Sequence, residues 1–211
     1  MFTAAQQIDS IIIRPSTSSP LFVGVDIVAP AFSIFSDQIG GEILLSKQVY
    51  NQWHAAAEVG YHINAYNKGA WDVEVSGVFT RIGFNYVISQ DIENANNIFY
   101  LGARIGYSPF ALTVNRYIIQ GYDAVSAEGS LPAHTTHSIW LEPLGGARVK
   151  LFNTNFYADA SARLRINAFY INPHGINSLV MPGFGQSQSG LGFGLIWAVG
   201  YQIPLSRSSN M

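Results

Sequence analysis

The sequence of 211 residues is short of three features: cysteine, charge and long apolar runs. It has no cysteine, which excludes a scaffold held by disulfide bonds. Charged residues make up 11% of the chain, less than half of the roughly 25% that soluble domains carry. Lys and Arg number 11 against 13 Asp and Glu, so no basic field exists to attract nucleic acid. No uninterrupted apolar stretch reaches the roughly 18 residues that a membrane helix needs.

The residues that are abundant narrow the class of protein further. Hydrophobic residues make up 48% of the chain, aromatic residues 13%, and glycine occurs 20 times. Disorder requires low hydrophobicity together with high charge, so this composition excludes it. The length fits one domain, or two at most.

The first residues lack the regular pattern of the rest of the chain. Thr3, Ala4 and Ala5 are small residues like those at the end of a signal peptide, but no basic segment or long apolar segment precedes them. We interpret residues 1–19 as a signal-peptide remnant or a flexible periplasmic segment. The domain itself is then 20–206, with a C-terminal tail at 207–211.

From residue 20 onward, apolar and polar residues alternate with a period of two, which is typical of β-strands. In one segment, for example, Val78, Ile82 and Phe84 alternate with Arg81 and Gly83. The pattern predicts eight strands, over residues 21–29, 39–45, 53–64, 78–88, 99–108, 139–151, 156–170 and 191–205.

Charged residues within these strands share a face with glycine and other small or polar residues, and none lies on the apolar face. The predicted charged face holds Asp26, Glu42, Glu58, Arg81, Arg104, Glu142, Arg148, Lys150, Asp159, Arg163 and Arg165. Two triplets, Glu142/Arg148/Lys150 and Asp159/Arg163/Arg165, keep this parity whatever register is chosen.

The composition of the charged face decides which side is inside. The outside of a soluble barrel should carry many Lys and Glu residues and has no need of glycine, which weakens strands. A narrow barrel of eight strands does need small inward residues. The sequence therefore predicts an all-β fold: an eight-stranded antiparallel up-and-down transmembrane β-barrel with a polar lumen filled by side chains. Unpaired charges would cost several kcal/mol each, so we expect a paired network and no wide pore.

The predicted connections alternate in length, as they do in outer-membrane barrels. Short connections are predicted at 46–52, 89–97 and 152–155, and longer ones at 30–38, 65–77, 109–137 and 171–190. This order places both termini in the periplasm of a Gram-negative bacterium and the connections after strands 1, 3, 5 and 7 outside the cell.

Aromatic residues on the apolar face fall near the strand ends, where amphipathic rings prefer the two membrane interfaces. The predicted periplasmic level holds Trp53, Tyr86, Phe99, Phe156 and Tyr201. The predicted outer level holds Tyr61, Tyr107, Tyr170 and Phe193.

Several short strings are similar to those of a known family. They are Val23–Asp26, Arg81–Tyr86, Tyr100–Tyr107, Met181–Phe184 and Tyr201–Leu205. With them, residues 20–205 resemble a family of small Bacteroidota outer-membrane β-barrels of unknown function. The resemblance implies a fold and a location but no activity.

No motif indicates a catalytic, cofactor or metal site. The glycines of Gly190–Gly194 lie at strand spacing with no helix after them, so they do not form a dinucleotide loop. His54, Glu58 and His62 share one strand face, but neighbours among them are about 13 Å apart. His134 and His137, with His174 from another loop, offer too few ligands for a closed zinc site.

We therefore predict a non-enzymatic outer-membrane barrel of structural or interaction role, within the lipid bilayer and without cofactors. Apolar residues in 109–137 and 171–190 predict either contact with a protein partner in an envelope assembly or loops that pack on each other as a lid. Two alternatives remain open: an enzyme with a site in its outer loops, and a soluble barrel that binds a ligand.

Overall fold

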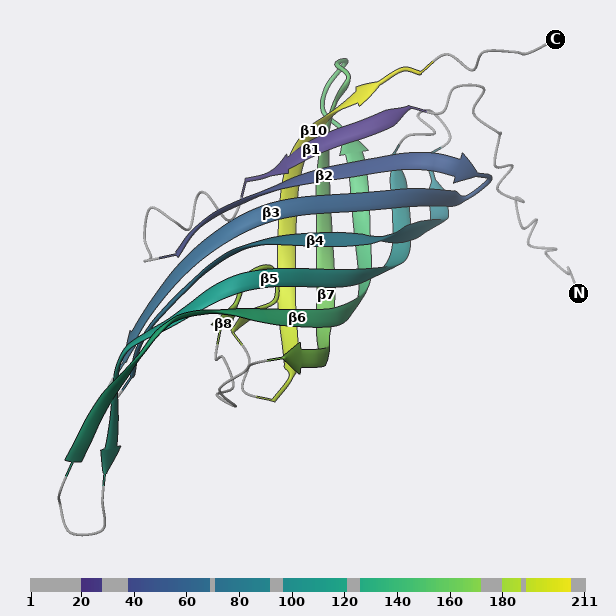
Figure 1. Cartoon of the computed structure of the whole chain (residues 1–211). Coiled ribbons are helices and arrows are strands. Elements are labelled where there is room, and N and C mark those ends of the chain that lie inside the picture. Colours follow the sequence, from purple (N-terminus) through teal and green to yellow (C-terminus); the bar gives the residue numbers. More distant parts are fainter. Residues whose placement is uncertain are drawn as a thin grey trace, which may run out of the picture.

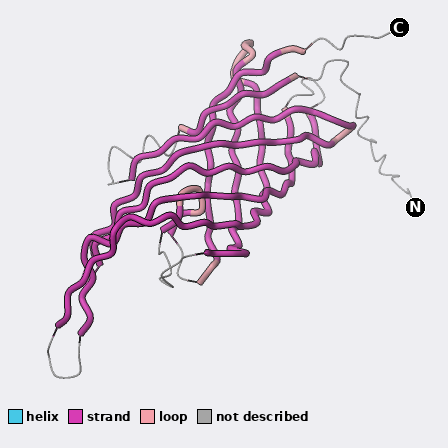
Figure 2. Tube along the Cα trace, in the orientation of Figure 1, coloured by secondary structure: helices cyan, strands magenta, loops and turns pink. Residues whose placement is uncertain are grey.

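The computed structural model describes residues 20–27, 38–68, 71–91, 97–120, 126–171, 180–186 and 189–205. The segments 1–19 and 206–211, and with them the predicted leader and tail, lie outside the described residues. The described part consists of strands and short connections (Figure 2). Within it, no helix has the length and apolar character needed to cross a membrane.

Eight strands close into one antiparallel barrel, which confirms the predicted fold (Figure 1). Each strand pairs with its neighbours in sequence, and the first strand closes the ring against the last. The barrel strands are β1 (Leu21–Asp26), β2 (Gln38–Tyr50), β3 (Trp53–Lys68), β4 (Trp71–Gln90), β5 (Ile98–Gln120), β6 (Ser126–Lys150), β7 (Phe156–Ile171) and β10 (Leu191–Ile203). A separate small hairpin, β8 (Val180–Met181) and β9 (Gly185–Gln186), lies between β7 and β10 in sequence.

Side chains alternate between the outside and the lumen along the barrel strands, with the parity that the sequence predicts except at the end of β7. On β4, Ile82 on the outside is 64% exposed, whereas its neighbour Arg81 in the lumen is 1% exposed. A pleated strand points successive side chains to opposite faces, so one register choice decides which residues are inside. Here the apolar residues are outside and the charged residues are inside.

One end of the barrel, which we call the turn end, carries short connections and both barrel termini. Its connections are residues 51–52, 91–97 and 151–155, close to the predicted short ones. β1 starts and β10 finishes at this end, because Leu21 pairs with Ile203. The short connections expected after strands 2, 4 and 6 are thus present, but the expected alternation in length fails after strands 3 and 5, where the gaps between strands are also short.

The opposite end, which we call the hairpin end, corrects two predicted loops. Segments 65–77 and 109–137 are mostly strand, apart from 69–70 and 121–125, which lie outside the described residues. The β5–β6 ladder continues to Gln120 and Ser126, whereas the β6–β7 ladder stops at His137 and Ile171. Continued pairing satisfies the backbone hydrogen bonds, so the hairpin extends well beyond β7 (Figure 1).

Two further residues depart from their predicted faces. Tyr170 was expected on the outside, but the β6–β7 register shifts between Ile139 and Trp140, which pair with Phe169 and Asn167. The resulting β-bulge exchanges the faces, so that Phe169 is outside and 66% exposed, whereas Tyr170 packs inward. Lys47 breaks the expectation of a charge-free outer face: β2 runs on past residue 45 and places Lys47 outside, near the turn end.

Candidate functional site

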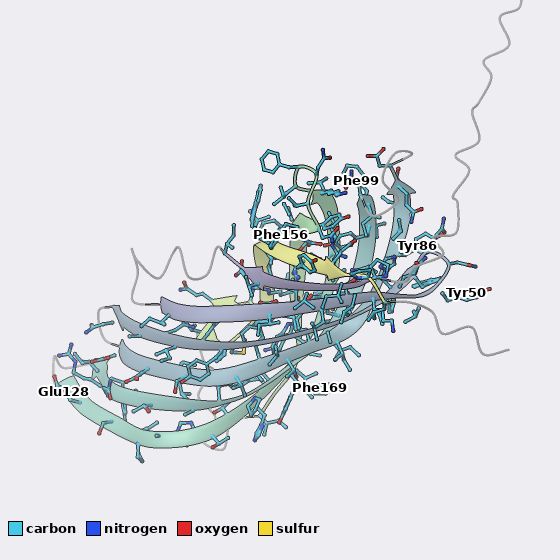
Figure 3. The ribbon with its side chains drawn as sticks, turned by 90° about the horizontal axis from the view of Figure 1, so that it is seen from above. Tyr50, Tyr86, Phe99, Glu128, Phe156 and Phe169 are labelled. Atoms are coloured by element: carbon cyan, nitrogen blue, oxygen red, sulfur yellow. The ribbon has the colours of Figure 1, made fainter. Side chains whose placement is uncertain are left out.

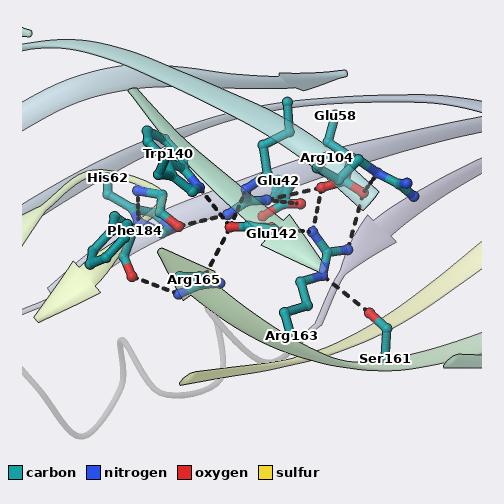
Figure 4. A network of polar contacts seen from close by, with 12 residues as sticks. Glu42, Glu58, His62, Arg104, Trp140, Glu142, Ser161, Arg163, Arg165 and Phe184 are labelled. Carbon is teal, nitrogen blue, oxygen red and sulfur yellow. Dashed lines mark hydrogen bonds and ion pairs between the residues drawn. The ribbon is translucent and has the colours of Figure 1, made fainter. Parts of the chain in front are cut away.

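The lumen at mid-height holds a cluster of seven charged side chains, which we call the central cluster (Figure 4). It comprises Glu42 of β2, Glu58 of β3, Arg81 of β4, Arg104 of β5, Glu142 of β6, and Arg163 and Arg165 of β7. Strand pairing brings them to one level, because Glu58 lies directly opposite Arg81 and Arg104 lies directly opposite Glu142. These two pairs, on the four neighbouring strands β3 to β6, thus place opposite charges beside each other.

Glu58 is the acceptor that joins the most strands. Arg163 binds it with two hydrogen bonds, from Nη1 to Oε2 at 2.5 Å and from Nη2 to Oε1 at 3.0 Å. Arg81 Nη1 donates to Oε2 at 3.0 Å, and Arg104 Nε donates to Oε1 at 3.1 Å. Both carboxylate oxygens of this buried side chain therefore accept from guanidinium groups on three strands.

Glu142 forms the second centre of the cluster. Its Oε1 atom accepts from Trp140 Nε1 at 2.8 Å and from Arg165 Nε at 3.0 Å. Arg81 Nε lies 3.1 Å from the same oxygen, and Arg163 Nη1 lies 3.3 Å from Oε2. Because Arg81 and Arg163 contact both glutamates, the ion pairs form one connected network rather than isolated pairs.

The arginines also bind backbone carbonyls, because four guanidinium groups meet three carboxylates. Arg81 Nη1 contacts Glu42 Oε1 at 2.6 Å and its Nη2 donates to the carbonyl of Gly183 at 2.7 Å. Arg104 Nη1 donates to the carbonyl of Phe84 at 2.7 Å. Buried charges are tolerated only when their hydrogen-bonding groups have partners. The backbone carbonyls accept hydrogen bonds from guanidinium N–H groups that the three carboxylates do not bind.

A smaller ion pair lies nearer the turn end. Arg148 Nε donates to Asp159 Oδ2 at 2.9 Å, and the two residues face each other across β6 and β7. Tyr100 donates its hydroxyl to Asp159 Oδ1 at 2.7 Å. The centroid of the Phe22 ring lies 3.7 Å from Arg148 Cζ, a cation–π contact. This level of the lumen is therefore also closed by side chains.

The structure thus places nine of the eleven predicted lumen charges in two networks. The other two, Asp26 and Lys150, lie outside these two sets. Asp26 is buried at the end of β1, opposite Ala198 of β10. Lys150 is half-buried at the end of β6, beside the turn.

Glycine makes room for large aromatic side chains in the lumen. A Cβ atom on Gly106 would lie 2.1 Å from the buried ring of Trp140, and one on Gly60 would lie 2.3 Å from the ring of Phe79. The predicted role of lumen glycines, to admit bulky inward neighbours in a narrow barrel, has its clearest examples here.

The hairpin end of the lumen is apolar, a feature that the sequence reading missed. One buried cluster comprises Val75, Phe79, Phe110, Leu112, Trp140, Met181 and Phe184. The last two belong to the segment Val180–Gln186, which we call the plug hairpin. It lies within the predicted loop 171–190, and the apolar string Met181–Phe184 was the available signal. A string of this kind fits an internal plug and a partner surface equally well.

The plug hairpin is tied to the central cluster by two hydrogen bonds and to His62 by a third (Figure 4). The carbonyl of Gly183 accepts from Arg81, and the carbonyl of Phe184 accepts from Arg165 Nη1 at 2.9 Å. The backbone N–H of Gly183 donates to His62 Nδ1 at 3.2 Å. Gly183 has φ +76°, a conformation that glycine adopts without strain.

The histidines do not come together as a metal site in the described residues. His62 accepts a hydrogen bond from the plug hairpin, and Glu58 is engaged by arginines. His134 and His137 lie on opposite faces of β6, where His137 Nδ1 contacts the Tyr107 hydroxyl at 3.0 Å. His174 lies outside the described residues.

Fold and lumen together define a closed eight-stranded barrel, apolar outside and filled inside by ion pairs and a plug. The chain belongs to the family described as Domain of unknown function (DUF6048), whose model matches residues 2–208. It matches no curated protein.

Three solved structures share a distant similarity with the chain. Neisserial surface protein A (NspA) has 13% identity and a TM-score of 0.43, with 90% of this chain and 98% of that chain covered. The attachment invasion locus protein Ail of Yersinia pestis has 10% identity and a TM-score of 0.42, with 88% and 98% covered. The beta domain of the Bordetella autotransporter BrkA has 18% identity and a TM-score of 0.38, with 71% and 57% covered.

Proposed function

We propose that this protein is an integral outer-membrane β-barrel of a Gram-negative bacterium, with a structural or interaction role. It is non-enzymatic and is not a wide pore, and its source is a member of the Bacteroidota. The observation that carries the proposal is the inversion of the barrel: large apolar side chains cover the outside, while the ion pairs are buried within.

The apolar band on the outside has the height of a bilayer core. On β4 the outward residues from Val78 to Ile88 contain no charge, and the next outward charge beyond Val78 is Glu74. Ten residue steps cover about 33 Å along a strand. At a strand tilt of roughly 35–45° this becomes about 23–27 Å, close to the apolar band of outer-membrane barrels.

Aromatic side chains mark one border of this band. Tyr86, Phe99 and Phe156 are exposed near the turn end, and Figure 3 shows them gathered with Tyr50 at that end, far from Glu128. Lys47 is also on the outside near the turn end. A lysine there can extend its ammonium group to the interface, so its charge does not have to enter the hydrocarbon.

The lumen supports a closed barrel rather than a pore. The side chains of Glu58, Arg81 and Arg163 meet across the lumen and are at most 2% exposed. The plug hairpin fills the lumen above them, and Arg148 with Asp159 fills it below. Water and ions would have to displace several buried ion pairs to pass.

The β5–β6 hairpin supports an interaction role. It extends beyond the barrel, where Arg116 and Glu128 are exposed (Figures 1 and 3). The inward residues of the two predicted loops, such as Phe110 and Phe184, are used in internal packing. A protein partner would therefore meet the outer surface of this hairpin, on the extracellular side if the turn end faces the periplasm.

The proposal is tested by location, fold and conductance together. We expect the protein in the outer-membrane fraction, with migration on a detergent gel that changes on heating. Recovery in the soluble fraction without detergent would favour a soluble ligand-binding barrel. Large, stable conductance in a planar bilayer would contradict the closed lumen.

The enzyme alternative has its own experiment, turnover of radiolabelled lipid or peptide. Here His134 and His137 cannot act as a pair, because they lie on opposite faces of β6. We expect no turnover by the wild-type protein. Turnover that is lost in the His134→Ala variant would overturn the non-enzymatic proposal.

A further inference from the structure

The plug hairpin occupies its place in the lumen without joining the barrel sheet. Its two strands, β8 and β9, have two residues each and pair only with each other among the described residues. The hairpin is held by apolar packing and by polar contacts that include those with Arg81, Arg165, His62 and Asn167. Such an element can detach while the barrel ladder stays intact, because no ladder hydrogen bond has to break.

The place that the hairpin fills combines an apolar wall with a cationic floor. The wall, which we call the outer cup, consists of Val75, Phe79, Phe110, Leu112 and Trp140. The floor presents the guanidinium groups of Arg81 and Arg165, which bind the carbonyls of Gly183 and Phe184. Met181 and Phe184, both at most 2% exposed, fill the cup above this floor.

The charges of the floor are not balanced by the hairpin. The central cluster contains four arginines and three glutamates, so its formal charge is +1. The hairpin offers only neutral carbonyl oxygens, whereas a carboxylate would add a negative charge and could accept two parallel hydrogen bonds from a guanidinium group. A molecule with one carboxylate and an aliphatic chain would match both the floor and the wall better than the hairpin does.

We infer that the outer cup is a binding site for a single-chain apolar carboxylate, such as a fatty acid, and that the plug hairpin is its internal competitor. Arg81 and Arg165 bind the carboxylate, and the chain of the ligand takes the place of Met181 and Phe184. The ligand enters as the hairpin leaves, while the rest of the central cluster keeps the barrel closed. The site is formed by lumen residues alone, so binding does not depend on which membrane contains the barrel.

Cysteine labelling tests the exchange, because the chain has no cysteine of its own. In a Met181→Cys variant we expect the thiol to react slowly with a maleimide. Addition of dodecanoate should raise the labelling rate about tenfold, because one charge-assisted hydrogen bond to the hairpin is then made to the ligand instead. A Leu112→Cys variant measures the accessibility of the wall of the cup. The ligand covers this wall when the hairpin leaves, so labelling of the variant should stay slow with and without dodecanoate. Ser130→Cys, exposed on the extended hairpin, should label fast throughout.

Two ligand controls separate binding from a general effect on the detergent or membrane. Dodecanol has the chain without the charge, and acetate has the charge without the chain. Neither should release the hairpin. Equal release by dodecanol would overturn the role of the arginines, and no change with dodecanoate would overturn the site.

Two further measurements test the role of Arg165 and, in a protein that keeps Met181, the binding of ligand in the cup. Adding Arg165→Gln to Met181→Cys should speed labelling without ligand and abolish the further rise with dodecanoate. In a variant whose only tryptophan is Trp140, a brominated dodecanoate should quench the emission, because Trp140 lines the cup. Absence of quenching by a saturating amount would overturn the inference even if Met181→Cys disturbed the fold.

Discussion

Replacing Glu58 by Gln removes the acceptor on which three arginines converge. The wild-type carboxylate accepts four hydrogen bonds, two from Arg163 and one each from Arg81 and Arg104. Glutamine keeps the shape but offers one oxygen. Its NH₂ group would face guanidinium donors where the second oxygen stood.

The expected loss of stability follows from this count. Two of the four hydrogen bonds lose their acceptor, and each bond to a charged group contributes roughly 1.5–3 kcal/mol. The formal charge of the central cluster also rises from +1 to +2 in a buried environment. We therefore expect Glu58→Gln to lower the free energy of unfolding by about 3–5 kcal/mol, the usual cost of breaking a buried ion pair.

The assay is equilibrium unfolding in urea with the protein in detergent micelles or lipid vesicles. The folded fraction is measured from the heat-modifiable migration of the protein on a gel. The matched control is Glu74→Gln, which removes an exposed carboxylate from the hairpin end and should change stability by less than about 0.5 kcal/mol. A double-mutant cycle with Arg163→Gln should give a coupling energy of about 1–3 kcal/mol. Equal effects of Glu58→Gln and Glu74→Gln would refute the reasoning, because they would mean that the network does not stabilise the lumen.

Three further predictions concern the outer face, the glycines and the lumen. Ile82→Arg places a charge in the middle of the apolar band and should lower the free energy of unfolding in lipid by about 2–4 kcal/mol. Ser130→Arg on the extended hairpin should lower it by almost nothing. Unfolding in vesicles measures both variants, and similar losses would contradict a lipid-facing band. Gly106→Val drives a side chain into Trp140 and should cost about 1–3 kcal/mol or more, whereas Gly41→Ala, with no atom within 4 Å of the added Cβ, should be tolerated. The purified barrel should show no large, stable conductance in a planar bilayer, and open-channel currents from the wild-type protein would contradict the filled lumen.

The barrel and the faces of its strands could be predicted from the sequence for a physical reason. Side chains of a strand alternate with a period of two, so a charge such as Arg81 next to Ile82 identifies the two faces at once. The small residues beside the charges then indicate the narrow interior. The sequence pattern could not supply the partners of each charge, because the contact of Glu58 with Arg163 spans the lumen and depends on the stagger of all the strands between them.

The hairpin end was harder to predict because its inward positions are apolar. Phe110 and Leu112 face the lumen, so the alternation of apolar and polar residues fades where β5 leaves the charged level. The segment 109–137 therefore looked like a loop although its described residues pair as a ladder. Tyr170 illustrates a second limit, since a single β-bulge reverses the parity and leaves no mark in the periodicity.

The plug hairpin shows why apolar segments between strands resist interpretation. Met181 and Phe184 could have served a partner, a lid or an internal plug, and composition does not distinguish these roles. The structure brings them against Phe79 and Trp140, and it brings the carbonyl of Gly183 to Arg81. Only the three-dimensional course of the chain links an apolar string near the C-terminus to a charge on β4.

Depth-dependent quenching of tryptophan emission tests the inverted barrel most directly. Trp197 lies on the outside and is 54% exposed, whereas Trp140 lies in the lumen and is 0% exposed. In bilayers with brominated lipid chains, a variant that keeps only Trp197 should be strongly quenched, and one that keeps only Trp140 should be quenched little. Equal weak quenching of both, with the protein remaining in the aqueous phase, would contradict an outer face that contacts lipid.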